Sequence, residues 1–273
     1  MKKLLILTFI TILLISGCLY NYQLEVPETR TWSAVNISQI EIRTDNGEIS
    51  VSAIQDTVIS ANITKRCRGK DKADAEKYIK NVVVEDTVIG NRLSLTTEMP
   101  DVSTRNYGCD FSVTAKESIY LDLNTSNGKV TISGMKSGAN VSTSNGALNQ
   151  SNTNGKTVLK TSNGKIIIQA HSRSMKAQTS NGQIECDIAG MPINDSCELR
   201  TSNGKVILSL PSNIAAGFEA STSNGEVTVT GFATVNYSRN ERTHKTGSIG
   251  NIGTGKAIVI ISTSNGDITI RAR

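Results

Sequence analysis

Apolar and polar residues alternate with a period of two on both sides of a short motif that recurs along the chain. The second and fourth residues after each Asn-Gly pair are apolar, as in Val130 and Ile132, Ile166 and Ile168, Ile184 and Cys186, Val206 and Leu208, Val227 and Val229, and Ile268 and Ile270. The fourth and sixth residues before the Asn are mostly apolar too, as in Leu123 and Leu121, Val141 and Ala139, and Leu199 and Cys197. This alternation predicts β-strands with one buried face.

The motif itself is Thr-Ser-Asn-Gly, and its spacing indicates a repeat architecture. It occurs seven times, with the Asn at Asn127, Asn145, Asn163, Asn181, Asn203, Asn224 and Asn265. The intervals between these residues are 18, 18, 18, 22, 21 and 41, so the last interval equals about two periods. Two related tetrapeptides begin at Thr44 and Asn152. A fixed period near 20 in a β-rich sequence predicts a solenoid.

Each repeat is expected to be a strand, a tight turn and a second strand. Asn-Gly favours the positive φ values of a two-residue turn, and one such unit alone is only marginally stable. Stacking one unit on the next completes the core, which predicts an all-β, single-stranded β-solenoid (β-helix) of about seven to eight rungs over residues 119–273. An insertion near residues 231–257 interrupts it, and Gly253-Thr254-Gly255 is interpreted as a turn into the last rung.

Stacking would place equivalent turn residues above one another. The Asn amides could then form hydrogen bonds along the axis, as Asn ladders do in cross-β structures. We interpret this ladder as structural and not as a binding loop, because Asn and Gly recur wherever the backbone must make a tight turn. The Thr two places before each Asn is expected to face inward and to cap the narrow end of the core.

The part of the chain before residue 119 differs from the repeats. Residues 36–118 are predicted to form a β-rich cap over the first rung, because an uncovered rung is an aggregation-prone edge. The cap contains one short helix near residues 70–80, with Asp71 or a neighbour as its N-cap.

The N-terminus has the features of an export signal. Lys2 and Lys3 precede an apolar run from Leu4 to Ile15, which is short for a bilayer span. Ile15-Ser16-Gly17-Cys18 resembles the lipobox of prokaryotic lipoproteins. Residues 1–17 are therefore predicted to be a lipoprotein signal peptide, Cys18 the lipidated residue, and residues 18–35 a segment close to the anchor. An ordinary secretory signal or a short uncleaved anchor remains open.

The composition indicates an aliphatic core and argues against a nucleic-acid-binding protein. The 273 residues are 37% hydrophobic and 19% charged, but only 4% aromatic, so aliphatic side chains must build the core. Loss of Lys2 and Lys3 would lower the net charge from +5 to +3. This charge is too small for the electrostatic footprint of a nucleic-acid-binding protein.

Four cysteines remain if Cys18 is lipidated. An even number in an exported chain favours disulfides. Cys186 is the last inward position of one rung and Cys197 the first of the next, so we predict a Cys186–Cys197 bridge and a Cys67–Cys109 bridge in the cap. Four buried thiols are the alternative.

No residue pattern predicts catalysis, a metal site or a cofactor. The residue after Asn-Gly is Lys129, Lys165 or Lys205 in several turns, and stacked lysines would repel Ca²⁺. His171 and His244 belong to no recognisable nucleophile motif, and His171 is expected to be a solvated turn residue.

The repeated Thr-Ser-Asn-Gly-x-Val/Ile-x-Val/Ile resembles the prokaryotic putative adhesin family, a domain of unknown function in envelope β-solenoids. The resemblance also includes Ile252-Gly253-Thr254-Gly255 followed by the last repeat, and it covers roughly residues 36–273. It implies the fold, but no catalytic residue. Lys116-Glu117 stands where the family often has a turn that contains Pro.

These observations favour a non-catalytic, lipid-anchored β-solenoid of the cell envelope that acts as an adhesin-like binding or scaffolding module. Its partner would be an envelope glycan or a surface protein. Two alternatives remain open. One is a carbohydrate-active enzyme, which paired carboxylates on one outward face would favour. The other is a self-assembling structural unit, which an uncapped last rung would favour, although Arg271 and Arg273 resemble edge protection.

Overall fold

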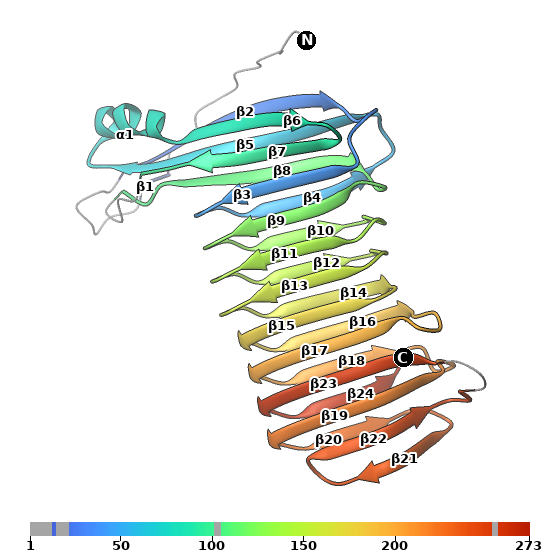
Figure 1. Cartoon of the computed structure of the whole chain (residues 1–273). Helices are drawn as coiled ribbons and strands as arrows, with labels where there is room; N and C mark the ends of the chain where they lie inside the picture. Colours follow the sequence, from blue (N-terminus) through green and yellow to red (C-terminus); the bar gives the residue numbers. More distant parts are fainter. Residues whose placement is uncertain (1–12, 15–21, 101–104, 253–255) are drawn as a thin grey trace.

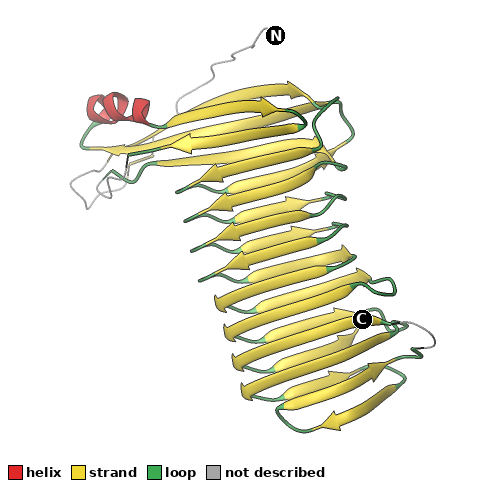
Figure 2. Cartoon of the chain, viewed as in Figure 1, coloured by secondary structure: helices red, strands yellow, loops and turns green. Residues whose placement is uncertain are grey.

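The computed structural model describes residues 13–14, 22–100, 105–252 and 256–273. The fold is all-β, as predicted, and nearly every described segment is a strand or a turn (Figure 2). The predicted signal peptide, apart from residues 13–14, and Cys18 lie outside the described residues. The helix expected near residues 70–80 is confirmed: α1 spans Lys72–Tyr78, and the Asp71 carboxylate caps it by accepting a hydrogen bond from the Asp74 N–H at 2.8 Å.

The described strands form two sheets of twelve strands each, and every sheet contains both parallel and antiparallel neighbours. Sheet A runs in the order β1 (Leu13–Leu14), β2 (Tyr22–Ser33), β5 (Val58–Gly69), β8 (Gly108–Lys116), β4 (Ile49–Ile54), β10 (Val130–Ser133), β12 (Leu148–Ser151), β14 (Ile166–Ser172), β16 (Ile184–Gly190), β18 (Val206–Leu210), β24 (Ile268–Ala272) and β20 (Val227–Thr230). Sheet B runs in the order β21 (Val235–Asn240), β22 (His244–Ile249), β19 (Ala216–Asn224), β23 (Ala257–Asn265), β17 (Ser196–Asn203), β15 (Met175–Asn181), β13 (Thr157–Thr161), β11 (Ala139–Thr143), β9 (Tyr120–Thr125), β3 (Gln39–Thr44), β7 (Arg92–Glu98) and β6 (Val83–Ile89).

Successive repeat strands alternate between the two sheets, so the chain passes from sheet B to sheet A at each Thr-Ser-Asn-Gly (Figure 1). We call one sheet B strand and the sheet A strand that follows it a coil. Each coil pairs in parallel with its neighbours in the stack, for example Val130 with Leu148 and Val141 with Leu159. The alternating apolar residues face the space between the sheets, where Leu121, Leu123 and Ile166 are fully buried. The predicted alternation of buried and outward positions is therefore confirmed.

The Asn-Gly pairs form corners and not the hairpin turns that the sequence predicts. The strands before and after each pair lie in different sheets, and no ladder Asn has a positive φ. Gly recurs for another reason, because the corners stack closely. A Cβ on Gly146 would lie 1.8 Å from the Gly128 carbonyl oxygen. The missing side chain, and not a left-handed backbone, explains why the corner needs Gly.

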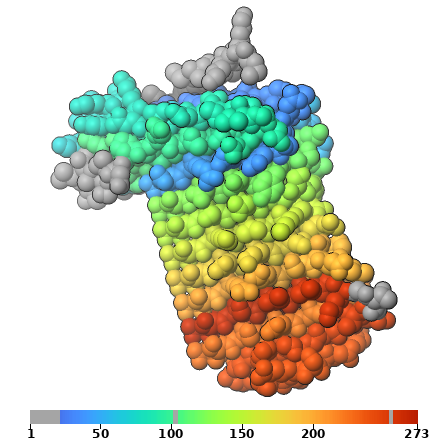
Figure 3. Space-filling model, in the orientation of Figure 1, coloured from blue at the N-terminus to red at the C-terminus, as the bar shows by residue number. Residues whose placement is uncertain are grey.

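The N-terminal part widens one end of the stack (Figure 3). Strands β2, β5 and β8 pair antiparallel and extend sheet A, while β7 pairs in parallel with β3 and carries the antiparallel β6. Strands β3 and β4 lie in the segment predicted as a cap, but they have the same arrangement as the strands of a repeat. They pair in parallel with β9 and β10, so the corner at Asn46 stacks on that at Asn127.

The last coil in the sequence is not the last coil in space. Strand β23 lies between β17 and β19, and β24 lies between β18 and β20. The segment Ile268–Ile270 is therefore no uncapped end rung, which was the feature that would favour self-assembly, and the interpretation of Arg271 and Arg273 as edge protection is wrong. The interval of 41 residues reflects this exchange of order, because the hairpin of β21 and β22 follows β20, and β23 then lies between β17 and β19. Period and alternation carry no information on spatial order, which is why the sequence missed it.

The predicted insertion near residues 231–257 contains a β-hairpin that covers the C-terminal end of the stack. Strand β22 pairs antiparallel with β19, and β21 pairs antiparallel with β22. The hairpin turn also reaches sheet A, where the Val227 N–H donates to the Arg242 carbonyl at 2.8 Å. This hairpin extends sheet B by two strands, whereas β20 ends sheet A.

Candidate functional site

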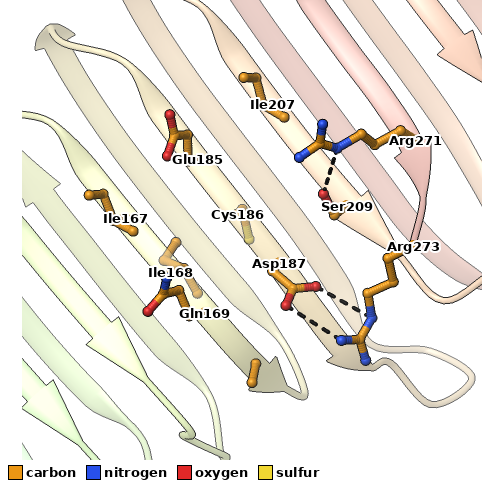
Figure 4. Close-up of a pocket in the computed structure, with 11 residues that line it drawn as sticks. Ile167, Ile168, Gln169, Glu185, Cys186, Asp187, Ile207, Ser209, Arg271 and Arg273 are labelled. Carbon is orange, nitrogen blue, oxygen red and sulfur yellow. Dashed lines mark hydrogen bonds and ion pairs between the residues drawn. The ribbon is translucent and has the colours of Figure 1, made fainter.

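The strongest candidate site is a groove on the outer face of sheet A, where β14, β16, β18 and β24 lie side by side (Figure 4). Its volume is about 530 Å³, within the range of small-ligand sites. Because side chains alternate along a strand, the outward residues of adjacent strands form rows across the sheet. Two such rows line the groove, and we name the groove by its position, the sheet A groove.

The first row is an acidic residue between two aliphatic ones. Glu185 pairs in register with Ile167 on one side and Ile207 on the other. Both isoleucines are half-buried although they point outward. Aliphatic side chains on an outer face have no core to pack against, so this pair forms a small apolar floor in an otherwise polar row.

The second row is polar and charged. Asp187 pairs in register with Ser209, and Ser209 with Arg271. The Arg271 Nε donates to the Ser209 hydroxyl oxygen at 3.0 Å, and the Arg273 Nε lies 3.4 Å from an Asp187 carboxylate oxygen. Figure 4 shows both arginines reaching across from β24 and its C-terminal end.

A β-bulge in β14 borders the groove. Ala170 has a φ of +52°, a left-handed conformation that is uncommon for any residue except Gly. The register between β14 and β16 shifts after Ile168, and His171 then pairs with Ile188. Bulges redirect side chains and occur often beside functional sites. Here Gln169 points outward as the alternation requires, and the bulge turns His171 toward the core.

His171 is therefore buried, which corrects the prediction of a solvated turn residue. Its Nδ1 lies 3.0 Å from the Thr153 hydroxyl and 3.1 Å from the Gln150 Nε2. An amide nitrogen only donates, so Nδ1 accepts and the ring is neutral. Burial lowers the pKa of His171 to about 4, although the Ser174 backbone and Asp195 offset part of that effect. No periodic pattern signals a bulge, so the alternation of residues alone could not place His171 inside.

The turn residues form a continuous hydrogen-bonded ladder along one edge of the stack. Each Asn Nδ2 donates to the Oδ1 of the Asn in the neighbouring coil at 2.7–2.9 Å, in the spatial order Asn46, Asn127, Asn145, Asn163, Asn181, Asn203, Asn265 and Asn224. The inward Thr of each motif donates to a Gly carbonyl of the adjacent corner, as Thr179 does to Gly164 at 3.1 Å. Both sets of bonds join coils to one another.

The four described cysteines are free and buried, and neither of the predicted disulfides is present. Cys186 and Cys197 lie on facing strands β16 and β17, and a hydrogen bond between the thiols, together with burial, raises the pKa of Cys186. Burial raises the pKa of Cys67 to about 11 and that of Cys109 to about 12. These thiols pack as small apolar groups.

Other classes of site find no support among the described residues. They contain no group of three or more His, Cys, Asp or Glu side chains with the geometry of a metal site. They also contain no helix with the length and apolar character that a membrane crossing requires.

Sequence reasoning missed the sheet A groove because its residues come from four separated strands, two of them 62 residues apart in the chain. It did identify Arg271 and Arg273, but for the wrong role. A usable signal was present in Ile167 and Ile207, which are aliphatic at positions that the repeat assigns to the outer face.

Taken together, the stacked parallel coils, the ladder of corners and the polar outer faces define a β-repeat protein with an open surface groove. The chain belongs to the Toastrack DUF4097 family, whose profile matches residues 21–271. This family membership confirms the resemblance that the repeated motif indicates.

Several solved structures are similar to the chain at low identity. A putative cell adhesion protein from Clostridium sporogenes is 12% identical, with 91% of this chain and 100% of that chain covered and a TM-score of 0.43. A putative adhesin from Bacteroides fragilis is 13% identical, with 90% and 97% covered and a TM-score of 0.40. A putative lipid binding protein from Parabacteroides distasonis is 12% identical, with 90% and 96% covered and a TM-score of 0.32. No curated protein matches the chain.

Proposed function

We propose that the chain is a non-catalytic, adhesin-like binding module of the cell envelope. The observation that carries this proposal is the sheet A groove, an open polar site on a rigid stack of hydrogen-bonded coils. A β-solenoid of about seven to eight rungs, as the repeat spacing predicts, presents such a site on an extended face. The partner is an envelope glycan or a surface protein, with no nucleic acid, and no cofactor takes part.

The module is held at the outer face of the membrane through lipid on Cys18. The apolar run before the lipobox supports export, and acyl chains contribute about 0.8 kcal/mol per buried methylene to membrane binding. We expect Cys18→Ser to release the protein from the membrane fraction. The test is fractionation of cells that express the wild type or the variant, and unchanged membrane association of the variant would contradict the anchor.

The binding role is tested by affinity capture of envelope components on the immobilised full chain, with glycan and protein fractions analysed separately. We expect one fraction to be enriched over a column that carries an unrelated β-rich protein. Enrichment of neither fraction would contradict the proposal.

A carbohydrate-active enzyme is the second candidate, since Glu185 and Asp187 form a pair of carboxylates on one outward face. Glycoside hydrolysis needs one of two such groups to hold a proton as the general acid. Here the Lys165 Nζ lies 2.9 Å from Glu185, and Arg273 pairs with Asp187. Both carboxylates are therefore engaged in ion pairs with cations of the chain itself, which favours a binding site over a hydrolytic one.

Self-assembly is less well supported than binding to a different molecule. Sheet B ends at the exposed strand β21, where Arg239 forms an ion pair with Glu241 just beyond the strand, and the Val227 N–H at the start of β20 bonds to the hairpin turn. Charged side chains and covered backbone groups on edge strands oppose the pairing of strands between molecules.

A further inference from the structure

One cation in the sheet A groove has no carboxylate partner among the described residues. Glu185 is paired with Lys165, and Asp187 with Arg273, whereas the exposed Arg271 bonds only to the Ser209 hydroxyl through Nε. The two Nη groups of Arg271 thus remain available. A guanidinium with both Nη groups available binds a carboxylate in a bidentate manner.

The floor beside Arg271 suits the apolar face of a sugar ring. Ile167 and Ile207 flank Glu185, while the next residues of the same row are Asn149 and Thr269. Ile167 and Ile207 lie two strand spacings apart, about 10 Å, so they suit two rings of an oligosaccharide, and the groove is open to solvent. An acyl chain needs a longer, enclosed apolar cavity.

The remaining polar groups suit hydroxyls. The carboxylates of Glu185 and Asp187 accept hydrogen bonds, and the exposed Gln169 amide can donate and accept. All three border the floor in Figure 4. A ligand that fits has a C–H face for the isoleucines, hydroxyl groups for the carboxylates and one carboxylate for Arg271.

We propose that the sheet A groove binds a saccharide that carries a carboxylate, of the uronic acid type. The inference rests on the proposed binding function and specifies its ligand. Arg271 pairs with the sugar carboxylate, Ser209 orients the guanidinium, and Ile167 and Ile207 pack against separate rings of the saccharide. Because β24 supplies Arg271, and Arg273 directly follows this strand, the groove exists only after the last coil has inserted beside β18.

The test is calorimetric titration of the full chain in detergent with tetragalacturonate, and with the neutral maltotetraose as the matched sugar. We expect tetragalacturonate to bind at least tenfold more tightly than maltotetraose. Arg271→Gln should weaken tetragalacturonate binding at least tenfold, and Ile207→Thr should weaken both sugars. Arg200→Gln removes an arginine of similar exposure from sheet B, so we expect it to leave the affinity unchanged. Far-ultraviolet circular dichroism checks that each variant is folded.

Three results would overturn the proposal. They are equal affinity for the two sugars, unchanged affinity in both groove variants, and binding only to anionic phosphatidylglycerol vesicles that Arg271→Gln abolishes. The last result assigns Arg271 to a lipid phosphate instead. Affinity capture of envelope components distinguishes a failure of the proposed ligand from a failure of the proposed binding function. If Arg271→Gln captures the same fraction as the wild type and tetragalacturonate does not bind, the binding function stands and the groove is not its site.

Discussion

Asn224 donates a hydrogen bond from Nδ2 to the Oδ1 of Asn265 at 2.8 Å, although Asn203 is the preceding ladder residue in the sequence. Asn265 in turn donates to Asn203 at 2.8 Å. The C-terminal coil therefore lies between two coils that precede it in the chain. Its Asn265 forms the same ladder hydrogen bonds to both neighbours as the Asn of an internal coil does. Stacking order depends on the contacts of each coil and not on its place in the sequence.

This relationship predicts unequal effects of two similar substitutions. Asn265→Ala removes two ladder hydrogen bonds, one as donor and one as acceptor, whereas Asn224→Ala removes one. Since a net hydrogen bond contributes about 0.5–1.5 kcal/mol, we expect Asn265→Ala to lower the free energy of unfolding by about 1–2 kcal/mol and Asn224→Ala by about half as much. Urea unfolding measures both values. Equal losses would mean that the ladder bonds do not stabilise the stack.

The close contact of the corners predicts that Gly164→Ala is severely destabilising. The added Cβ would lie 1.9 Å from the Gly146 carbonyl oxygen, and backbone atoms cannot move away as a flexible side chain can. We expect a loss of about 3 kcal/mol or more in the free energy of unfolding. Gly190→Ala is the control, because its Cβ would meet only the Ser172 hydroxyl at 3.9 Å. Thermal unfolding midpoints compare the two, and similar midpoints would argue against close stacking.

The buried His171 predicts a loss of stability in mild acid. The unfolded chain binds a proton at this residue near pH 6.5, whereas the folded protein does so only near pH 4. The contribution of His171 is thus complete above about pH 6.5 and decreases as the pH falls toward 4, by a total of about 3 kcal/mol. Urea unfolding at several pH values measures it.

His171→Gln removes the titrating group and keeps a polar side chain beside Gln150 and Thr153. We expect the stability of this variant to depend less on pH between 6.5 and 4 than that of the wild type. An equal slope in wild type and His171→Gln would show that His171 is protonated in the folded protein.

The state of the cysteines predicts a labelling pattern. Cys67, Cys109, Cys186 and Cys197 are free and buried, so iodoacetamide should leave them unmodified in the folded protein. Unfolding without a reducing agent should expose all four to modification, because no disulfide holds them. Peptide mapping by mass spectrometry identifies each site. If Cys186 and Cys197 react only after reduction, the bridge predicted from the sequence forms in the mature protein.

Local rules predict much of this fold. The period of two and the recurring corner define which side chains are buried, and Asp71 defines where the helix begins, because these features depend on neighbouring residues. The position of β23 and β24 depends on contacts between distant segments that are chemically equivalent in every coil. Because the contacts are equivalent, the sequence does not indicate which coil lies beside which.

The sheet A groove was harder to predict than the fold. Its rows join residues from four strands, and Arg271 meets Ser209 only because the last coil inserts beside β18. The bulge at Ala170 also could not be predicted, because one extra residue changes the alternation of buried and exposed side chains only locally. The aliphatic residues Ile167 and Ile207 at outward positions were the sequence feature that could have indicated the site.

The Asn ladder has a direction, since every amide donates toward the N-terminal end of the stack. The row begins with an amide nitrogen at Asn46 and ends with an amide oxygen at Asn224. Side-chain dipoles that point the same way add together, as peptide dipoles do in an α-helix. One edge of the molecule is consequently electrically polarised along its length, with its positive pole at the corner between β3 and β4.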